Sequence, residues 1–243
     1  MSASEELGYD IVYNWDHFFP LYGNREGKHF ECWTMLAAWA EQTATIEIGP
    51  LVACNSYRNP NLVADMARTI DHISGGRFVL GLGGGWKKRD YEEYGYEFGT
   101  AATRLRSLAR NMPIIDERLA KLNPPPVRKM PILIAGTGLT ITLPIVARHA
   151  DRWHAAFPDH TDEMEKPIAV LKRHCEGIGR DPGEIMWSVG VQPEELATFL
   201  ANEADDFVEM GVTEFTLGFN GPEWDVGRGR DWLAWRDDLN STR

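Results

Sequence analysis

Short apolar segments alternate with amphipathic segments along almost the whole chain, and this alternation limits the possible folds more than any other feature. Strand then helix, repeated, is typical of parallel strands joined by right-handed crossovers. The sequence therefore predicts an α/β fold with seven visible strands. Each apolar run has the length of a buried strand, and the runs are Ile11–Trp15, Ile46–Ala53, Phe78–Leu82, Ile132–Ala135, Arg152–Ala156, Ile185–Val191 and Glu214–Phe219.

The helical segments between these runs keep one apolar face each. Asn59–Ser74 is the clearest, because Asn59 can cap the helix, Pro60 suits its first turn, and Gly75 and Gly76 end it. The other helices are expected at Cys32–Thr43, Thr103–Leu122 with a break at Pro113, Leu139–Ala150, Glu163–Ile178, Pro193–Met210 and Arg230–Leu239.

In a chain of 243 residues, this pattern favours a TIM-type (β/α)8 barrel over an open doubly wound sheet. Seven strands are one short of a complete barrel, so the barrel is expected to lack its first strand. The segment Glu5–Gly8 is typical of the last turn of a helix with a glycine stop, and a complete barrel would have a strand before that helix. No linker divides the chain, so we expect one domain over residues 1–243.

Composition excludes several classes of function. The net charge of −11 argues against nucleic acid or an anionic membrane as a partner. Cys32, Cys54 and Cys175 are far apart and lack CxxC spacing, which argues against a disulfide framework and favours a reducing cytoplasm. No apolar stretch approaches the roughly 20 residues needed to span a bilayer, and the N-terminus does not resemble a secretory signal.

The segment Arg77–Trp86, RFVLGLGGGW, runs from an apolar strand directly into three glycines. A dinucleotide fingerprint needs a third glycine where Trp86 stands, and a P-loop needs Ser or Thr where Lys88 stands, so position excludes both. Gly83–Gly85 lack Cβ atoms, which lets this backbone lie close to a ligand. A tight turn from strand to helix is an equally good interpretation of the loop alone.

Residues that follow the strands form the active face of such barrels. Asp16 and His17 follow the first run, where they suit ring orientation and proton transfer, or else a loop cap and a structural histidine. Arg58 follows the second run and suits an anion or a surface carboxylate. Gly136–Gly138 leads straight into the helix expected at Leu139–Ala150, which suits a phosphate or a simple N-cap.

The remaining histidines predict no metal site. His154 lies near the end of its strand, where it can line the pocket. The others lack HExxH or comparable spacing, and they are His29, His72, His149, His160 and His174. No G-x-S-x-G elbow is present for a serine nucleophile.

Four motifs carry a family resemblance over nearly the whole chain. They lie in ELGYDIVYNWDHFFP, in IEIGPLVACNSYRNPNLVADMARTIDHISGGRFVLGLGGGW, and in PILIAGTG followed by the helix to ARHADRWH. In this order they resemble the luciferase-like monooxygenase superfamily, specifically its coenzyme F420-dependent oxidoreductases. The resemblance implies a TIM-type barrel that binds the deazaflavin F420, or FMN in sister branches, at its C-terminal face, usually as a homodimer.

The resemblance also implies roles for residues. Asp16 and His17 match the acidic-histidine pair beside the deazaflavin ring, with His17 as acid or base, and aspartate there favours F420 over FMN. Leu51–Cys54 matches a strand end that backs the ring, with the family's cis peptide placed at Leu51-Val52. The residues implied to line the cofactor are Leu51, Val52, Ala53, Cys54, Gly83, Gly84, Gly85 and Trp86, with Gly136, Thr137 and Gly138 at its phosphate. Trp86 stands where the sugar-phosphate dehydrogenases of the family have a catalytic glutamate, which argues against that substrate.

The implied function is hydride transfer between F420 and a small organic substrate, with His17 handling a proton. Two alternatives stay open: an FMN-dependent monooxygenase supplied by a separate reductase, and a non-catalytic flavin- or deazaflavin-binding relic. The relic is suggested by the missing first strand. Three explanations for the absence of that strand stay open, in this order: a true start upstream, a gap filled by the N-terminus or a dimer partner, and lost activity.

Overall fold

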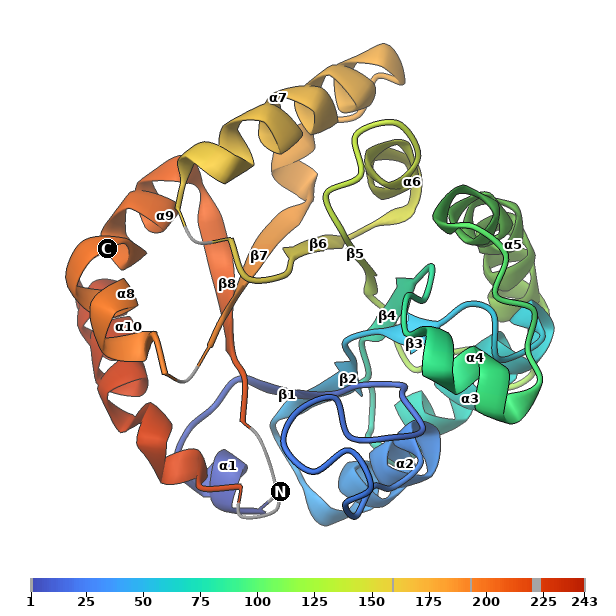
Figure 1. The fold of residues 1–243 in the computed structure, drawn as a ribbon, viewed down its shortest axis with the longest axis horizontal. Coiled ribbons are helices and arrows are strands. Elements are labelled where there is room, and N and C mark those ends of the chain that lie inside the picture. The colour runs from blue at the N-terminus through green and yellow to red at the C-terminus, as the bar shows by residue number, and fades with distance from the viewer. Residues whose placement is uncertain (1, 159, 193, 220–223, 243) are drawn as a thin grey trace.

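The predicted strand–helix repeat is present in the computed structural model, which describes residues 2–158, 160–192, 194–219 and 224–242. The strands lie around a central axis and the helices cover them on the outside (Figure 1). All strand pairings are parallel. The strands are β1 (Ile11–Asn14), β2 (Glu47–Pro50), β3 (Ala53–Cys54), β4 (Leu80–Gly83), β5 (Ile132–Ala135), β6 (Arg152–Ala155), β7 (Met186–Val191) and β8 (Val212–Leu217).

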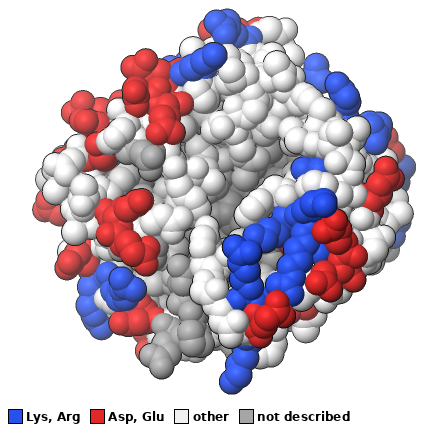
Figure 2. All heavy atoms as spheres, in the orientation of Figure 1, with Lys and Arg blue, Asp and Glu red and all other residues white. Residues whose placement is uncertain are grey.

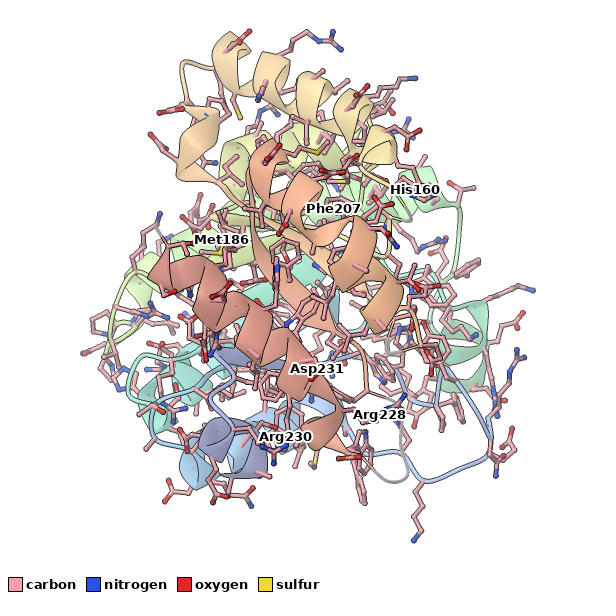
Figure 3. All side chains as sticks on the ribbon, turned by 90° about the vertical axis from the view of Figure 1, so that its left-hand side faces the viewer. His160, Met186, Phe207, Arg228, Arg230 and Asp231 are labelled. Carbon is pink, nitrogen blue, oxygen red and sulfur yellow. The ribbon has the colours of Figure 1, made fainter. Side chains whose placement is uncertain are left out.

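The helices follow the strands in the expected order, with two short 3-10 helices labelled η. The α-helices are α1 (Ser2–Glu6), α2 (Cys32–Gln42), α3 (Pro60–Ile73), α4 (Lys88–Tyr94), α5 (Ala101–Lys121), α6 (Thr142–His149), α7 (Asp162–Gly177), α8 (Leu196–Asn202), α9 (Ala204–Met210) and α10 (Arg230–Ser241). The 3-10 helices are η1 (Pro182–Glu184) and η2 (Val226–Gly229). On the outside, α10 lies beside α9 (Figure 3), where Trp235 Nε1 donates to Asp205 at 3.3 Å.

The strands follow one another around the axis in chain order. β1 pairs with β2, and β3 to β8 form a six-stranded sheet. β2 and β3 are the two parts of the predicted strand Ile46–Ala53, which is interrupted where the Leu51–Val52 peptide is cis. A parallel bridge between Ile48 and Phe78 joins β2 to the segment before β4. One predicted strand is thus two short ones, and each of the other six predicted runs overlaps one strand.

Side chains hold β1 and β8 together where the ring would close (Figure 1). The Tyr13 hydroxyl on β1 donates to Glu214 on β8 at 3.2 Å. Arg152 on β6 pairs with Glu214 at 2.8 Å and with Glu47 on β2 at 2.5 Å. No backbone bridge pairs β8 with β1 within the described residues. An ionic cluster inside the barrel therefore links the two sheets.

The N-terminal helix α1 is fixed to the loop before β2. The Glu5 carboxylate accepts hydrogen bonds from the backbone amides of Ala44, Thr45 and Ile46. These bonds stabilise the charged form, and they lower the pKa of Glu5 to about 2. The helix ends as predicted, with Gly8 in the left-handed region at φ 88°.

Two helix predictions are wrong. The break expected at Pro113 is absent, because α5 runs through it from Ala101 to Lys121. A proline inside a helix costs about 3 kcal/mol, but α5 buries Leu108, Met112 and Ile115, each worth about 1.5–3 kcal/mol. The helix expected at Pro193–Met210 is divided into α8 and α9. Glu203 separates them with a φ of −123°, outside the helical region, and Pro193 lies outside the described residues.

Other boundaries move by a few residues. β8 begins at Val212, two residues before the predicted Glu214, and α6 begins at Thr142 instead of Leu139. The short helix α4 was not predicted. Its end is marked by Gly95 at φ 73°, a left-handed glycine of the kind that commonly follows a helix.

Candidate functional site

The loops that follow β1, β3 and β4 meet on the face turned to the viewer in Figure 1. They are the loop from β1 to α2, the turn from β3 to α3, and the glycine segment from β4 to α4. This face is hollowed at its centre (Figure 2). It is the C-terminal end of the strands, where the sequence predicted the site.

His17 is held by a carboxylate from a different part of the chain. Its Nδ1 lies 2.5 Å from Oδ2 of Asp90, on α4. The His17 side chain is 11% exposed and that of Asp90 is 1% exposed. Burial lowers the pKa of His17, and the hydrogen bond and charge of Asp90 oppose that effect. In this pair Asp90 is therefore buried, whereas solvent can still reach His17.

Asp90 is itself oriented by its neighbours. The Tyr57 hydroxyl donates to Oδ2 at 3.3 Å, and the backbone amide of Phe18 donates to Oδ1 at 3.4 Å. Tyr57 packs against Phe18, Tyr91 and Tyr96, with ring centroids 4.8–5.1 Å apart. An aromatic cluster thus supports the carboxylate behind His17.

Asp16 is next to His17 in the chain, but its carboxylate contacts other residues. Its carboxylate receives two hydrogen bonds from Arg58, at 2.6 and 3.1 Å, and one from the Cys54 amide at 2.9 Å. Burial raises the pKa of Asp16, and Arg58 opposes that rise. Asp16 therefore contacts the β3 turn, while His17 contacts α4. Arg58 binds this buried carboxylate and Glu31, rather than a surface carboxylate alone.

The glycine segment after β4 packs closely against its own protein. A Cβ on Gly83 would lie 2.5 Å from Val52 Cγ2, and one on Gly85 would lie 2.5 Å from Cys54 Sγ. Gly85 also has a left-handed φ of 74°. Glycine is therefore required here by packing and conformation, which supports the interpretation as a tight turn. Gly84 and Gly85 are half-exposed, so their backbone remains accessible to a ligand.

Two further side chains lie at this segment. Trp86 is 61% exposed, and its ring stands edge-on to His17 with centroids 5.7 Å apart. Arg104 on α5 donates from Nε to the Gly85 carbonyl at 3.0 Å and from Nη1 to the Phe98 carbonyl at 2.8 Å. Arg104 thus fixes the glycine turn from behind.

The strand end that was predicted to back a ring has the expected form. The Leu51–Val52 peptide is cis at the predicted position, and Ala53 and Cys54 continue as β3 beside β4. Leu51 and Val52 are half-buried, whereas Ala53 and Cys54 are buried. The Leu51 amide donates to the Asn14 carbonyl at 2.6 Å, so the interruption lies next to the end of β1.

The turn after β5 forms a second part of the face. Gly136 has a left-handed φ of 120°, and its amide donates to the His154 carbonyl at 2.9 Å. Thr137 and Gly138 are exposed. The helix does not begin at Leu139 as expected, because the Leu139–Ile141 turn separates Gly138 from α6.

His154 lies inside the barrel. It is 3% exposed, and its Nδ1 lies 2.8 Å from the Ser188 hydroxyl. Burial lowers the pKa of His154 to about 4, so its imidazole is neutral at pH 7. A buried neutral imidazole bonded to a hydroxyl indicates a structural role.

Sequence reasoning missed Asp90, Tyr57 and Arg104. Asp90 is 73 residues from His17 and lies on a helix that was not predicted. Gly95, in a position to end a short helix, was the available signal. Nothing in the spacing indicated which carboxylate His17 would meet.

A separate cavity of about 680 Å³ opens at the opposite end of the barrel, at the amino ends of β6, β7 and β8. Met186, labelled in Figure 3, lies at its wall. Arg152 also lines it, but Arg152 is paired with Glu47 and Glu214. The histidine–carboxylate pair is therefore at the other end of the molecule from this cavity.

Within the described ranges, no group of three His, Cys, Asp or Glu side chains is arranged to hold a metal ion. A search of the same ranges for a helix of the length and apolarity required to cross a bilayer finds none. The chemistry visible on the face is therefore that of the His17–Asp90 pair and the accessible glycine backbone.

Comparison with known proteins gives similar sequences and folds. The F420-dependent glucose-6-phosphate dehydrogenase of Amycolatopsis mediterranei is 30% identical over 168 residues, which cover 61% of this chain and 48% of the relative. The chain thus spans about half the length of that relative.

Two solved structures share the fold. An F420-dependent secondary alcohol dehydrogenase, solved with an F420-acetone adduct, has a TM-score of 0.81 and 15% identity over 96% of this chain and 92% of that one. The oxygenating constituent of 3,6-diketocamphane monooxygenase from Pseudomonas putida, solved with FMN, has a TM-score of 0.61 and 14% identity, covering 85% of this chain and 65% of that one. The α/β barrel of this chain is therefore a fold found in both F420-binding and FMN-binding proteins.

The family itself is established by the sequence. The model of the luciferase-like monooxygenase family matches residues 1–193, which is most of the chain and includes β1 to β7. The segment contains every residue of the site described above. This chain belongs to the luciferase-like monooxygenase family.

Proposed function

We propose that this chain is an F420-dependent oxidoreductase that transfers a hydride between the deazaflavin and an organic substrate. The observation that carries the proposal is the His17–Asp90 pair, at 2.5 Å, beside the accessible backbone of Gly84 and Gly85. F420-dependent proteins among the relatives and the structural neighbours support the choice of cofactor.

The residues present fit a flat, anionic cofactor. A flat ring needs a wall without projecting side chains, and Gly84 and Gly85 offer backbone alone. The half-buried Leu51–Val52 segment, beside β1, would back the ring. Exposed Thr137 and Gly138 would hold the phosphate through a hydroxyl and free amides.

The Asp90 contact decides which nitrogen of His17 handles a proton. An ionised carboxylate only accepts hydrogen bonds, so Nδ1 of neutral His17 carries the hydrogen and Nε2 is left as the acceptor. When bound, F420 supplies the hydride chemistry. His17 Nε2 would take the hydroxyl proton of an alcohol as it is oxidised, and would return that proton when a carbonyl is reduced.

The cysteine pattern leads us to propose a cytoplasmic location, and the resemblance leads us to propose a homodimer. Light scattering of the purified protein measures the mass in solution, and a dimer of the 27.5 kDa chain has twice that mass. A monomer at micromolar concentration would contradict the dimer.

The cofactor is tested by titrating the purified protein with F420 and with FMN and following the fluorescence of each. We expect tight, saturable binding of F420 and weak binding of FMN. A preference for FMN would instead support a two-component monooxygenase, the function implied by the FMN-bound neighbour.

One variant and one longer chain sharpen this titration. His17→Ala should bind F420 as the wild type does and lose turnover, because His17 is proposed to move a proton and not to bind the ring. Failure of the wild type to bind either cofactor, in a chain extended to any upstream start as well, would contradict both enzymatic functions and favour the non-catalytic relic.

A further inference from the structure

The rim of the central hollow carries positive charge on a strongly acidic protein. Figure 2 shows Lys and Arg side chains gathered along one side of the hollow, with Asp and Glu on their outer side. Figure 1 places α4 and the loop from β1 to α2 at this position. The chain as a whole has a net charge of −11. Cationic side chains therefore lie along one side of this mouth although the chain as a whole is acidic.

Three cations of this region are not neutralised by a partner. Arg25, Lys28 and Lys87 form no ion pair with any carboxylate of the described residues. The two cations that follow Lys87 are paired, since Lys88 lies 2.8 Å from Glu92 and Arg89 lies 2.7 Å from Glu26. Lys88 and Arg89 are thus neutralised by carboxylates of the described residues, whereas Arg25, Lys28 and Lys87 are not. We call these three residues the basic rim.

The basic rim is attached to the proposed reaction site. Lys87 Nζ lies 5.1 Å from the centroid of the Trp86 ring, and that ring lies 5.7 Å from His17. His29, next to Lys28, donates from Nε2 to the His17 carbonyl at 2.7 Å. Arg89 donates to the Arg25 carbonyl at 3.2 Å, which holds the loop against α4. Lys28 and Lys87 are therefore each next in the chain to a residue that contacts His17, and Arg25 contacts α4 through its own carbonyl.

We propose that the basic rim, Arg25, Lys28 and Lys87, binds an anionic group of the substrate while the apolar part of that substrate lies against Trp86. This inference rests on the proposed function for the identity of the reacting site, and it names the substrate class as an alcohol or carbonyl compound with a carboxylate or phosphate. Unpaired cations beside an exposed indole recognise such a molecule through charge at one end and ring contact at the other. The cofactor phosphate is proposed to bind at the Gly136–Gly138 turn, which follows β5. The basic rim belongs to other loops, so we assign it to the substrate.

The local potential is tested first, without any cofactor. The emission of Trp86 is obtained as the difference between the wild type and Trp86→Phe, and its quenching by iodide is compared with quenching by neutral acrylamide. Trp224, which is 59% exposed and follows a different strand, serves as the reference indole. We expect a higher iodide-to-acrylamide ratio at Trp86 than at Trp224. Equal ratios would overturn the inference.

Binding is tested with a matched pair of secondary alcohols, 4-(1-hydroxyethyl)benzoate and 1-phenylethanol, by calorimetry with and without F420. We expect the carboxylate to bind about tenfold tighter at low salt, with the advantage lost at high salt. Lys87→Gln should reduce the advantage, and Lys88→Gln, which removes a charge already paired with Glu92, should keep it. Equal affinities, or no binding of either compound, would overturn the inference.

The same variants separate this inference from the proposed function. Lys87→Gln should bind F420 with unchanged affinity, because the rim is assigned to the substrate. A selective loss of F420 affinity in Lys87→Gln would assign the rim to the anionic tail of the cofactor and overturn the substrate role. If the wild type does not bind F420 at all, the proposed function fails, while the quenching and benzoate results still decide the charge of the rim.

Discussion

His17 is half-buried and His154 is buried, and the two histidines differ in the partner of Nδ1. His17, at the C-terminal face, meets the Asp90 carboxylate at 2.5 Å. His154, inside the barrel, meets the Ser188 hydroxyl at 2.8 Å. Burial lowers the pKa of both imidazoles. Asp90 opposes that effect at His17, whereas among the described residues no charged group opposes it at His154, where the pKa falls to about 4.

The difference indicates what each histidine can do. A group that accepts and returns protons near neutral pH needs a pKa close to the working pH. The carboxylate keeps the pKa of His17 nearer that range, and the half-exposed backbone of Gly84 and Gly85 leaves room for a ligand beside it. His154 stays neutral and packed, which suits a structural residue.

The largest expected effect is on turnover. His17→Ala should lower kcat by about a thousandfold, because the proton then has no positioned acceptor. Its F420 affinity and melting temperature should stay near those of the wild type. His154→Gln is the matched variant and should keep kcat near the wild-type value. Equal losses of kcat in the two variants would remove the distinction between the two histidines.

The pH dependence of stability should come mainly from His154. Its folded-state pKa, about 4, lies below the unfolded value of 6.5, so the unfolded chain binds more protons between these pH values. The stabilisation is therefore complete above pH 6.5 and is lost as the pH falls toward 4, by about 3 kcal/mol. Denaturant unfolding at several pH values measures this slope. His154→Gln should reduce it, and an unchanged slope in that variant would contradict the assignment.

Removing the partner of His17 should affect both the rate and its pH dependence. Asp90→Asn is expected to lower kcat/KM by about a hundredfold, since the imidazole loses the group that fixes its tautomer. In alcohol oxidation, kcat/KM falls as His17 becomes protonated at low pH. Asp90 raises the pKa of His17, so this acidic limb should move to lower pH in Asp90→Asn.

Asp16→Asn is the control for that shift. The charge of Asp16 also raises the pKa of His17, but less than Asp90 does, so the limb should move less. The main effect should be on stability, because Arg58 loses its buried partner. A larger shift of the limb in Asp16→Asn than in Asp90→Asn would contradict the role of Asp90 in setting the pKa of His17.

The smallest effect is expected at Ser188. Ser188→Ala removes the hydroxyl that satisfies His154 and should lower the free energy of unfolding by about 1 kcal/mol. The acidic limb of kcat/KM should stay in place. Movement of that limb would mean that His154, and not His17, titrates in the reaction.

The fold could largely be predicted from the sequence because its signals are local. Apolar runs and helix caps such as Asn59 mark elements within a few residues, and the cap is present in α3. The failures come from tertiary packing. The burial of Leu108 and Met112 lets α5 continue past Pro113, which no local signal indicates.

The site could be predicted only in part. The sequence indicated His17 and the strand end at Leu51–Val52, and the cis peptide lies there. It did not indicate the partner of His17, which is Asp90. The carboxylate that reaches His17 comes from α4, 73 residues away in the chain, and only the folded barrel creates this contact.

The central claim is that Asp90 makes His17 the histidine that titrates in the reaction. Its most direct test is an NMR titration of the imidazoles in the wild type and in Asp90→Asn. We expect the pKa of His17 to lie below 6.5 and above that of His154, and to fall in Asp90→Asn while that of His154 is unchanged. An unchanged pKa of His17 in Asp90→Asn would contradict the claim.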